Sequence, residues 1–86
     1  MSTINDDIRK LIVGVRKITK KDIDLIVMNI PTQYDLNKDV DWDKNFKYDL
    51  TPVIVDGKSR HDVSFYQFNS DRVLEPVLRC KFKHLN

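Results

Sequence analysis

Hydrophobic residues near the start of the chain recur with the spacing of one face of an α-helix. They lie three or four positions apart, which places them on a single stripe of a helix with 3.6 residues per turn. The stripe consists of Ile4, Ile8, Leu11, Ile12 and Val15. Ser2 or Thr3 can cap this segment, and acidic residues then precede basic ones, as the helix dipole favours. The pattern predicts an amphipathic helix.

The next segment, residues 19–30, fits two kinds of structure. Thr19 to Asp22 resembles a capping box with Asp in place of Glu. The apolar residues after it have helical spacing and end at Pro31, and they are Ile23, Ile26, Val27 and Ile30. The same stretch is short and rich in β-branched residues, which suits a buried strand. Because the cap and the spacing agree, the sequence favours a second helix, with a strand as the alternative.

Residues 32–51 show no clear period, and Asn, Asp and Lys dominate them. Aromatic residues are scattered among these polar positions. We predict a long aromatic and acidic loop, with one helical turn as an option, of a length that is uncommon in small domains and often functional.

The last third of the chain predicts strands. Residues 52–55 form a short apolar run, Asp56-Gly57 is a strong turn signal, and residues 63–68 suit a returning strand. After Pro76, apolar and basic residues alternate as in a third strand. A helix over residues 71–82 is the rival, disfavoured because Pro76 would lie beyond its first turn.

Together these segments predict an α+β fold in one domain, residues 1–86. It has two N-terminal helices, a long aromatic and acidic loop, and a small three-stranded antiparallel sheet.

Composition narrows the classes of protein that fit. The 86 residues are 41% hydrophobic and 33% charged, with a net charge of +2. No apolar run approaches the roughly 18–20 residues of a membrane span, and no secretory signal pattern is present, so we expect a cytoplasmic protein without a membrane partner. The chain lacks alanine and has two glycines. Alanine and glycine use G/C-rich codons, so their scarcity indicates a genome of low G/C content. Short chains of this composition resemble accessory proteins of AT-rich bacteriophages in style only.

Several chemistries are disfavoured. Alternate oxygen side chains from Asp35 to Asp43 suggest a calcium loop, but Val40 and Phe46 replace its required Gly and Glu. Cys80 is the single cysteine, which excludes an internal disulfide. Ser59, His61 and Asp62 contain the residue types of a hydrolase triad, as Cys80 and His84 do for a thiolate and base. The members of a catalytic triad normally come from separate elements, so we expect that the protein is not an enzyme. We also expect that it binds no cofactor and no metal.

Binding remains, and the leading hypothesis is a protein that binds and inhibits a host protein. Aromatic residues act as anchors in interfaces, and charged residues around them set orientation and association rate. The expected protein-binding residues are Tyr34, Asp39, Asp41, Trp42, Asp43 and Tyr48.

The alternative is an RNA- or DNA-binding module that uses a basic strand face and a helix end. Converging cations would bind phosphates, and Tyr66 and Phe68 on the same sheet could stack on bases. The candidate cations are Lys17, Lys20, Lys21, Lys58, Arg60, Arg79, Lys81 and Lys83. An exposed third strand could also recruit a second copy as a homodimer.

Overall fold

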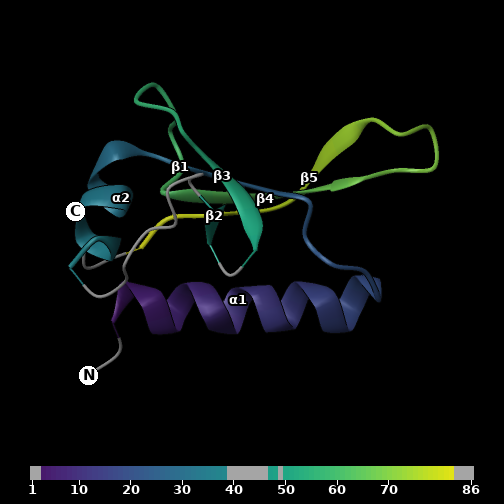
Figure 1. The fold of residues 1–86 in the computed structure, drawn as a ribbon, viewed down its shortest axis with the longest axis horizontal. Helices are drawn as coiled ribbons and strands as arrows, with labels where there is room; N and C mark the ends of the chain where they lie inside the picture. Colours follow the sequence, from purple (N-terminus) through teal and green to yellow (C-terminus); the bar gives the residue numbers. More distant parts are fainter. Residues whose placement is uncertain (1–2, 39–46, 49, 83–86) are drawn as a thin grey trace.

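A mixed β-sheet and a long helix form the two main layers of the fold (Figure 1). The computed structural model describes residues 3–38, 47–48 and 50–82. The elements along the chain are α1 (Ile4–Thr19), β1 (Leu25–Met28), α2 (Ile30–Leu36), β2 (Lys47–Tyr48), β3 (Thr51–Val55), β4 (Val63–Phe68) and β5 (Leu74–Cys80). In the sheet the strands lie in the order β2-β3-β1-β4-β5, so β1 is central. The predicted α+β class is therefore confirmed, and the described residues contain two helices.

Helix α1 has the cap and the buried stripe that the sequence predicts. The Thr3 hydroxyl accepts a hydrogen bond from the Asp6 backbone N–H at 3.1 Å, and the Asp6 carboxylate accepts one from the Thr3 N–H. Ile4, Ile8 and Val15 are buried against the sheet. At the other end, the buried Gln67 of β4 donates from Nε2 to the Thr19 hydroxyl at 2.8 Å. These contacts fix α1 along the sheet at both ends.

The end of α1 has a left-handed residue, which gives a stability prediction. Lys20 has φ 63°, and its backbone N–H donates to the Arg16 carbonyl. A side chain disfavours this conformation, whereas glycine adopts it readily. We expect Lys20→Gly to raise the free energy of unfolding by about 0.5–1 kcal/mol. Urea denaturation would measure it, and Lys21→Gly, outside the left-handed position, is the matched control that should not stabilise.

The second predicted helix, over residues 19–30, is wrong, because residues 25–28 form β1. This strand pairs with β3 in parallel and with β4 in antiparallel orientation, and Ile26 and Met28 are fully buried. All four residues of β1 are apolar, including the half-buried Leu25 and Val27 on the face away from α1, so its sequence lacks the alternation that marks a strand. Helix α2 begins where the sequence predicts that the earlier helix ends. The Asn29 side chain caps it at the Thr32 N–H, and Pro31 lies in its first turn, where a missing N–H costs nothing.

The predicted loop over residues 32–51, in which the sequence allows one helical turn, has regular structure at both of its ends. Its first residues belong to α2, which is one short helix of seven residues, and Lys47–Tyr48 forms β2. Strand β2 pairs with β3 in antiparallel orientation, with Tyr48 opposite Thr51. Residues 39–46, with most of the acidic side chains of this segment, lie outside the described residues.

The sheet also differs from the prediction, since the described part of the chain contributes five strands of mixed direction rather than three antiparallel ones. The sequence predicts β3 and β4 as a hairpin, but β1 lies between them. The β4–β5 pair is antiparallel, and the rival helix over residues 71–82 is wrong. Pro76 is accommodated because β5 is an edge strand with a register shift opposite Phe65 and Tyr66.

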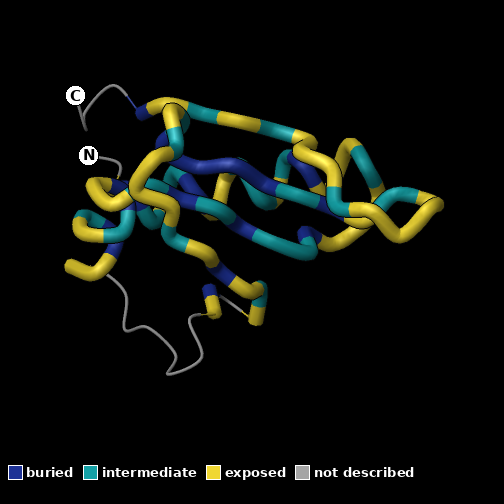
Figure 2. Tube along the Cα trace, turned by 90° about the horizontal axis from the view of Figure 1, so that it is seen from above, coloured by how far each residue is buried: buried dark blue, intermediate teal, exposed yellow. Residues whose placement is uncertain are grey.

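The core lies between α1 and the sheet face that points towards it. Ile26, Met28, Val63 and Phe65 are fully buried there. Tyr48 joins them, and its hydroxyl donates to the Asn5 side-chain oxygen of α1. Figure 2, in which the molecule is seen from above, shows the buried central strands between more exposed edges. One face of the sheet is therefore filled by α1, while the other face has no helix over it among the described residues (Figure 1).

Candidate nucleic-acid interface on the open sheet face

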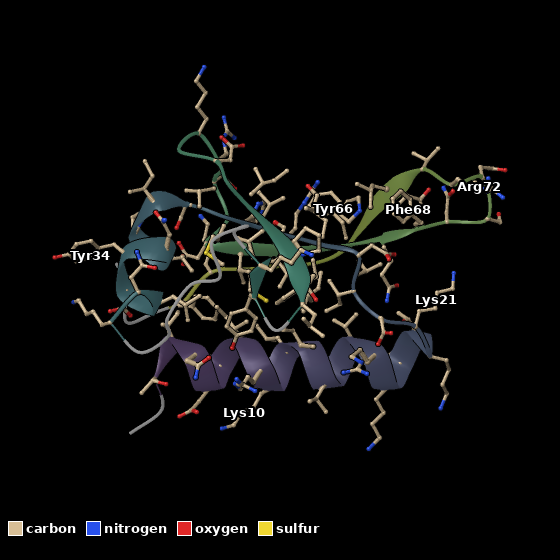
Figure 3. All side chains as sticks on the ribbon, in the orientation of Figure 1. Lys10, Lys21, Tyr34, Tyr66, Phe68 and Arg72 are labelled. Atoms are coloured by element: carbon tan, nitrogen blue, oxygen red, sulfur yellow. The ribbon has the colours of Figure 1, made fainter. Side chains whose placement is uncertain are left out.

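The face of the sheet opposite α1, which we call the open face, carries an aromatic pair. Cross-strand partners share a face, and Leu25 lies opposite Tyr66, which lies opposite Pro76. Two residues further along β4, Phe68 lies opposite Leu74. Figure 3 shows the side chains of Tyr66 and Phe68 on the side of β4 away from α1. The pleat of the sheet thus puts both rings on the same surface.

These rings are accessible. Phe68 is 47% exposed, Tyr66 is partly exposed, and Ile54 on the same face is 52% exposed. Residues two apart on a strand are separated by roughly 6.5–7 Å, so the two rings form adjacent, separate stacking positions. Leu25 and Pro76 flank Tyr66 with apolar surface. The result is a strip of aromatic and apolar groups along β4, which we call the aromatic strip.

Cations lie around this strip. Arg79 is exposed and lies opposite Ser64 on the open face, one row from Tyr66, and Lys81 follows the end of β5. At one end the β3–β4 loop, with Lys58 and Arg60, rises on the side away from α1 (Figure 1). At the other end Arg72 is in the β4–β5 turn (Figure 3). A strand of phosphates running along β4 would therefore meet positive charge at each end and at its side.

Three carboxylates near this strip accept hydrogen bonds from backbone or side-chain donors, while Asp71, beside Arg72 in the β4–β5 turn, is exposed. Asp24 accepts from the Phe68 N–H at 2.9 Å, and Asp56 accepts from the Lys58 N–H at 2.9 Å. Asp62 is buried and accepts from the Asn29 side chain. The ion pairs Arg16–Asp22 and Lys38–Asp35 lie away from the open face. Neither of them uses a cation of the open face.

The turn that presents Arg72 is held by its own hydrogen bonds. The Asn69 side-chain oxygen accepts from the backbone N–H groups of Asp71 and Val73, at 2.8 and 3.1 Å. Arg72 itself has φ 62°. These bonds fix the turn at one end of the aromatic strip.

The predicted nucleic-acid cations do not form one surface. Lys58, Arg60, Arg79 and Lys81 lie around the sheet, as described above. Lys17, Lys20 and Lys21 are exposed at the C-terminal end of α1, in the other layer, near the Arg16–Asp22 ion pair. Lys21 is nonetheless at the same end of the molecule as Arg72 (Figure 3), while Lys83 is outside the described residues.

The predicted protein-binding residues are also separated. Tyr34 is 68% exposed on α2, and the Lys38 ammonium group lies 5.0 Å from its ring centre. Tyr48 is 2% exposed and belongs to the core, so its ring does not serve as a surface anchor. The remaining four residues, Asp39, Asp41, Trp42 and Asp43, lie outside the described residues.

The candidate catalytic side chains have structural partners. The Ser59 hydroxyl bonds to the backbone of His61, not to its ring. Both Asp62 oxygens accept hydrogen bonds, from the Asn29 side chain and the Phe82 N–H. Burial raises the pKa of the Cys80 thiol, which favours its protonated form. No cluster of three His, Cys, Asp or Glu side chains suited to a metal occurs in the described ranges.

Part of the interface is visible in the sequence. The alternation of residues 63–68 identifies Tyr66 and Phe68 as partners on one face of a strand. The sequence does not reveal Arg72, because a single arginine in a predicted break between strands carries no pattern.

Comparisons with protein-family models, curated proteins and solved structures found no match. Among the described residues, no helix is long and apolar enough to cross a membrane.

Proposed function

We propose that this protein binds single-stranded nucleic acid along β4 on the open face. The observation that carries the proposal is the pair Tyr66 and Phe68, side by side on a sheet face without a covering helix among the described residues, with basic residues at both ends. Uncovered sheets with aromatic residues are a recurrent platform for unstacked bases.

Base stacking supplies the sequence-independent part of this binding. Every base has a flat face, so Tyr66 and Phe68 would each hold one base with little preference among sequences. In a duplex the base faces are already covered by their neighbours. The aromatic strip therefore favours single strands over double strands.

Contacts with phosphate groups supply the rest of the binding free energy. Lys47 lies opposite Pro52, in the row of β3 that alternates with the buried Val53, so it belongs to the open face with the other basic residues. Among the described residues, the candidate phosphate contacts are Lys58, Arg60, Arg72, Arg79 and Lys81 around the strip and Lys47 farther across the open face, on β2. They lie on several sides of the strip, so one strand can contact only some of them at once. With about four phosphate contacts, the logarithm of the binding constant should fall with the logarithm of salt with a slope of about −3 for a single strand.

The test is fluorescence anisotropy with three labelled probes: a mixed-sequence RNA, the corresponding single-stranded DNA, and a DNA duplex of equal length. Each has about 12 nucleotides per strand, a length suited to such sites. Over a fourfold rise in salt concentration, we expect single-strand affinity to fall about 50-fold, because counterions are released on binding. The single strands should bind more tightly than the duplex. Binding that is insensitive to salt, or tighter to the duplex, would overturn the proposal.

The hypothesis of a host-protein inhibitor stays a prediction. Its central anchor, Trp42, lies outside the described residues, and Tyr48 is buried. Trp42→Ala tests it directly: a folded variant with unchanged affinity for a captured partner would remove that loop from the interface.

A further inference from the structure

A second surface lies on the α1 side of the sheet, in a groove between α1 and the edge strand β5. The groove has a volume of about 270 Å³. Leu11, Gly14 and Ile18 of α1 form one wall, and Val77 and Leu78 of β5 form the other. We call this the α1–β5 groove. It is separate from the aromatic strip, because its side chains lie on the α1 side of the sheet.

Gly14 keeps the groove open. A Cβ built at this position would have no atom within 4 Å other than those of its own helix turn and chain neighbours. Glycine inside a helix costs about 1 kcal/mol relative to alanine, so the open space has an energetic cost. Ile18 is 83% exposed and Val77 is 39% exposed beside it. Apolar groups at this groove are therefore left in contact with water.

The groove runs beside the outer edge of β5. This strand pairs with β4 on one side, and among the described residues no strand pairs with it on the other. Pro76 and the register shift hinder pairing along its first half, as in many protected edges. The second half, Val77 to Cys80, contains no proline. A strand added there would point alternate side chains into the α1–β5 groove.

The charged side chains around the β5 edge indicate which kind of partner would bind there. Three basic side chains border this edge, namely Lys10 on α1 and Arg79 and Lys81 on and after β5, and one acidic side chain of α1, Asp7, lies beside Lys10 and Lys81. The acidic Glu75 lies at the far end of β5 and accepts from the Asn69 side chain. A second copy would bring like charges together, which opposes association. A partner with carboxylates beside Arg79 and Lys81 is favoured instead.

We propose that the β5 edge binds an extended segment of a partner protein in which apolar and acidic residues alternate. The segment adds to the sheet as a sixth strand through main-chain hydrogen bonds to residues 77–80. Its apolar side chains enter the α1–β5 groove, and its acidic side chains face Arg79 and Lys81.

The probe is an end-capped ten-residue peptide that alternates Val and Glu, added to the full-length ¹⁵N-labelled protein at neutral pH. We expect concentration-dependent amide shifts at residues 77–80 and at Gly14. A peptide with Lys in place of Glu, and one N-methylated at alternate residues, should each bind at least about tenfold more weakly, because they lose charge complementarity and main-chain pairing respectively.

Gly14→Leu is the variant that tests the groove. Leucine favours a helix, so folding is retained, and its side chain occupies the space that a partner's apolar group needs. We expect peptide affinity to fall about tenfold, equivalent to excluding one apolar side chain. Val13→Leu is the matched control, since Val13 is 62% exposed on α1 and does not line the groove. Its peptide affinity should be unchanged.

Three results would overturn this inference. They are equal binding of the lysine peptide, unchanged affinity of folded Gly14→Leu, and shifts at residues 77–80 that arise from self-association without peptide. Nucleic-acid affinity of Gly14→Leu should equal that of the unmodified protein, which keeps this test separate from that of the open face.

Discussion

Replacing both Tyr66 and Phe68 with alanine is expected to weaken single-strand binding by about 100-fold or more. Base–aromatic stacking contributes about 1–3 kcal/mol per base, and the double variant removes both stacking positions. Phe68 is 47% exposed and neither ring belongs to the buried core, so the fold should be retained. Anisotropy titration at low salt measures the loss, and circular dichroism with thermal unfolding checks the fold.

The control for this prediction is another exposed tyrosine. Tyr34→Ala removes a ring that is 68% exposed on α2, away from the open face. Its affinity for the oligonucleotide should be unchanged. The exchange Tyr66→Phe with Phe68→Tyr should also bind normally, because both positions keep a flat ring. A folded double-alanine variant with full affinity would show that the open face is not the binding surface.

The local part of the fold could be predicted because α1 is amphipathic. Its apolar stripe contacts the sheet and its other face contacts water, so the spacing of Ile4, Ile8 and Val15 identifies the buried side of the helix. The sequence of strand β1 shows no such spacing. Its residues are apolar on both faces, although only Ile26 and Met28 are fully buried, so the sequence shows no alternation. Pro31 strengthens the error, since a proline can begin a helix as well as end one.

The order of the strands depends on contacts distant in the sequence, which local patterns do not encode. Ile26 lies beside Val53 and Phe65, and this insertion of β1 separates two strands that resemble a hairpin in the sequence. The insertion matters for the site. It places Leu25 next to Tyr66 and moves the β3–β4 loop to one end of the open face.

The sequence shows which basic residues are candidates for the interface, but it does not show which of them lie on the same surface. Lys58, Arg60 and Arg79 are recognisable from a turn and a strand, and they lie near the open face. Lys17 to Lys21 lie in the other layer because α1 packs against the opposite face of the sheet. The distance between these groups follows from the packing of the layers, which the order of charges along the chain does not reveal.

Asp62→Ala is expected to lower the free energy of unfolding by about 3 kcal/mol, a large loss for a polar residue. Asp62 is 5% exposed, and its carboxylate accepts from the Asn29 side chain at 2.8 Å and from the Phe82 N–H at 2.6 Å. Hydrogen bonds to a charged group contribute about 1.5–3 kcal/mol each, and alanine removes both. The midpoint of urea denaturation at neutral pH, with its m-value, measures the loss.

The variant should also loosen α2, because Asp62 holds the residue that caps this helix. The Asn29 side-chain nitrogen donates to Asp62 while its oxygen accepts from the Thr32 N–H at 3.0 Å. Hydrogen-exchange protection of the Thr32 amide should therefore fall in Asp62→Ala, and by less in Asp62→Asn, which keeps one acceptor oxygen. Asp56→Ala is the matched control, since its exposed carboxylate accepts from the nearby Lys58 N–H within its own turn, and it should cost less than about 1 kcal/mol. If Asp62→Ala cost no more than this control, the carboxylate would not be what joins β1, β4 and α2 at this end of the sheet.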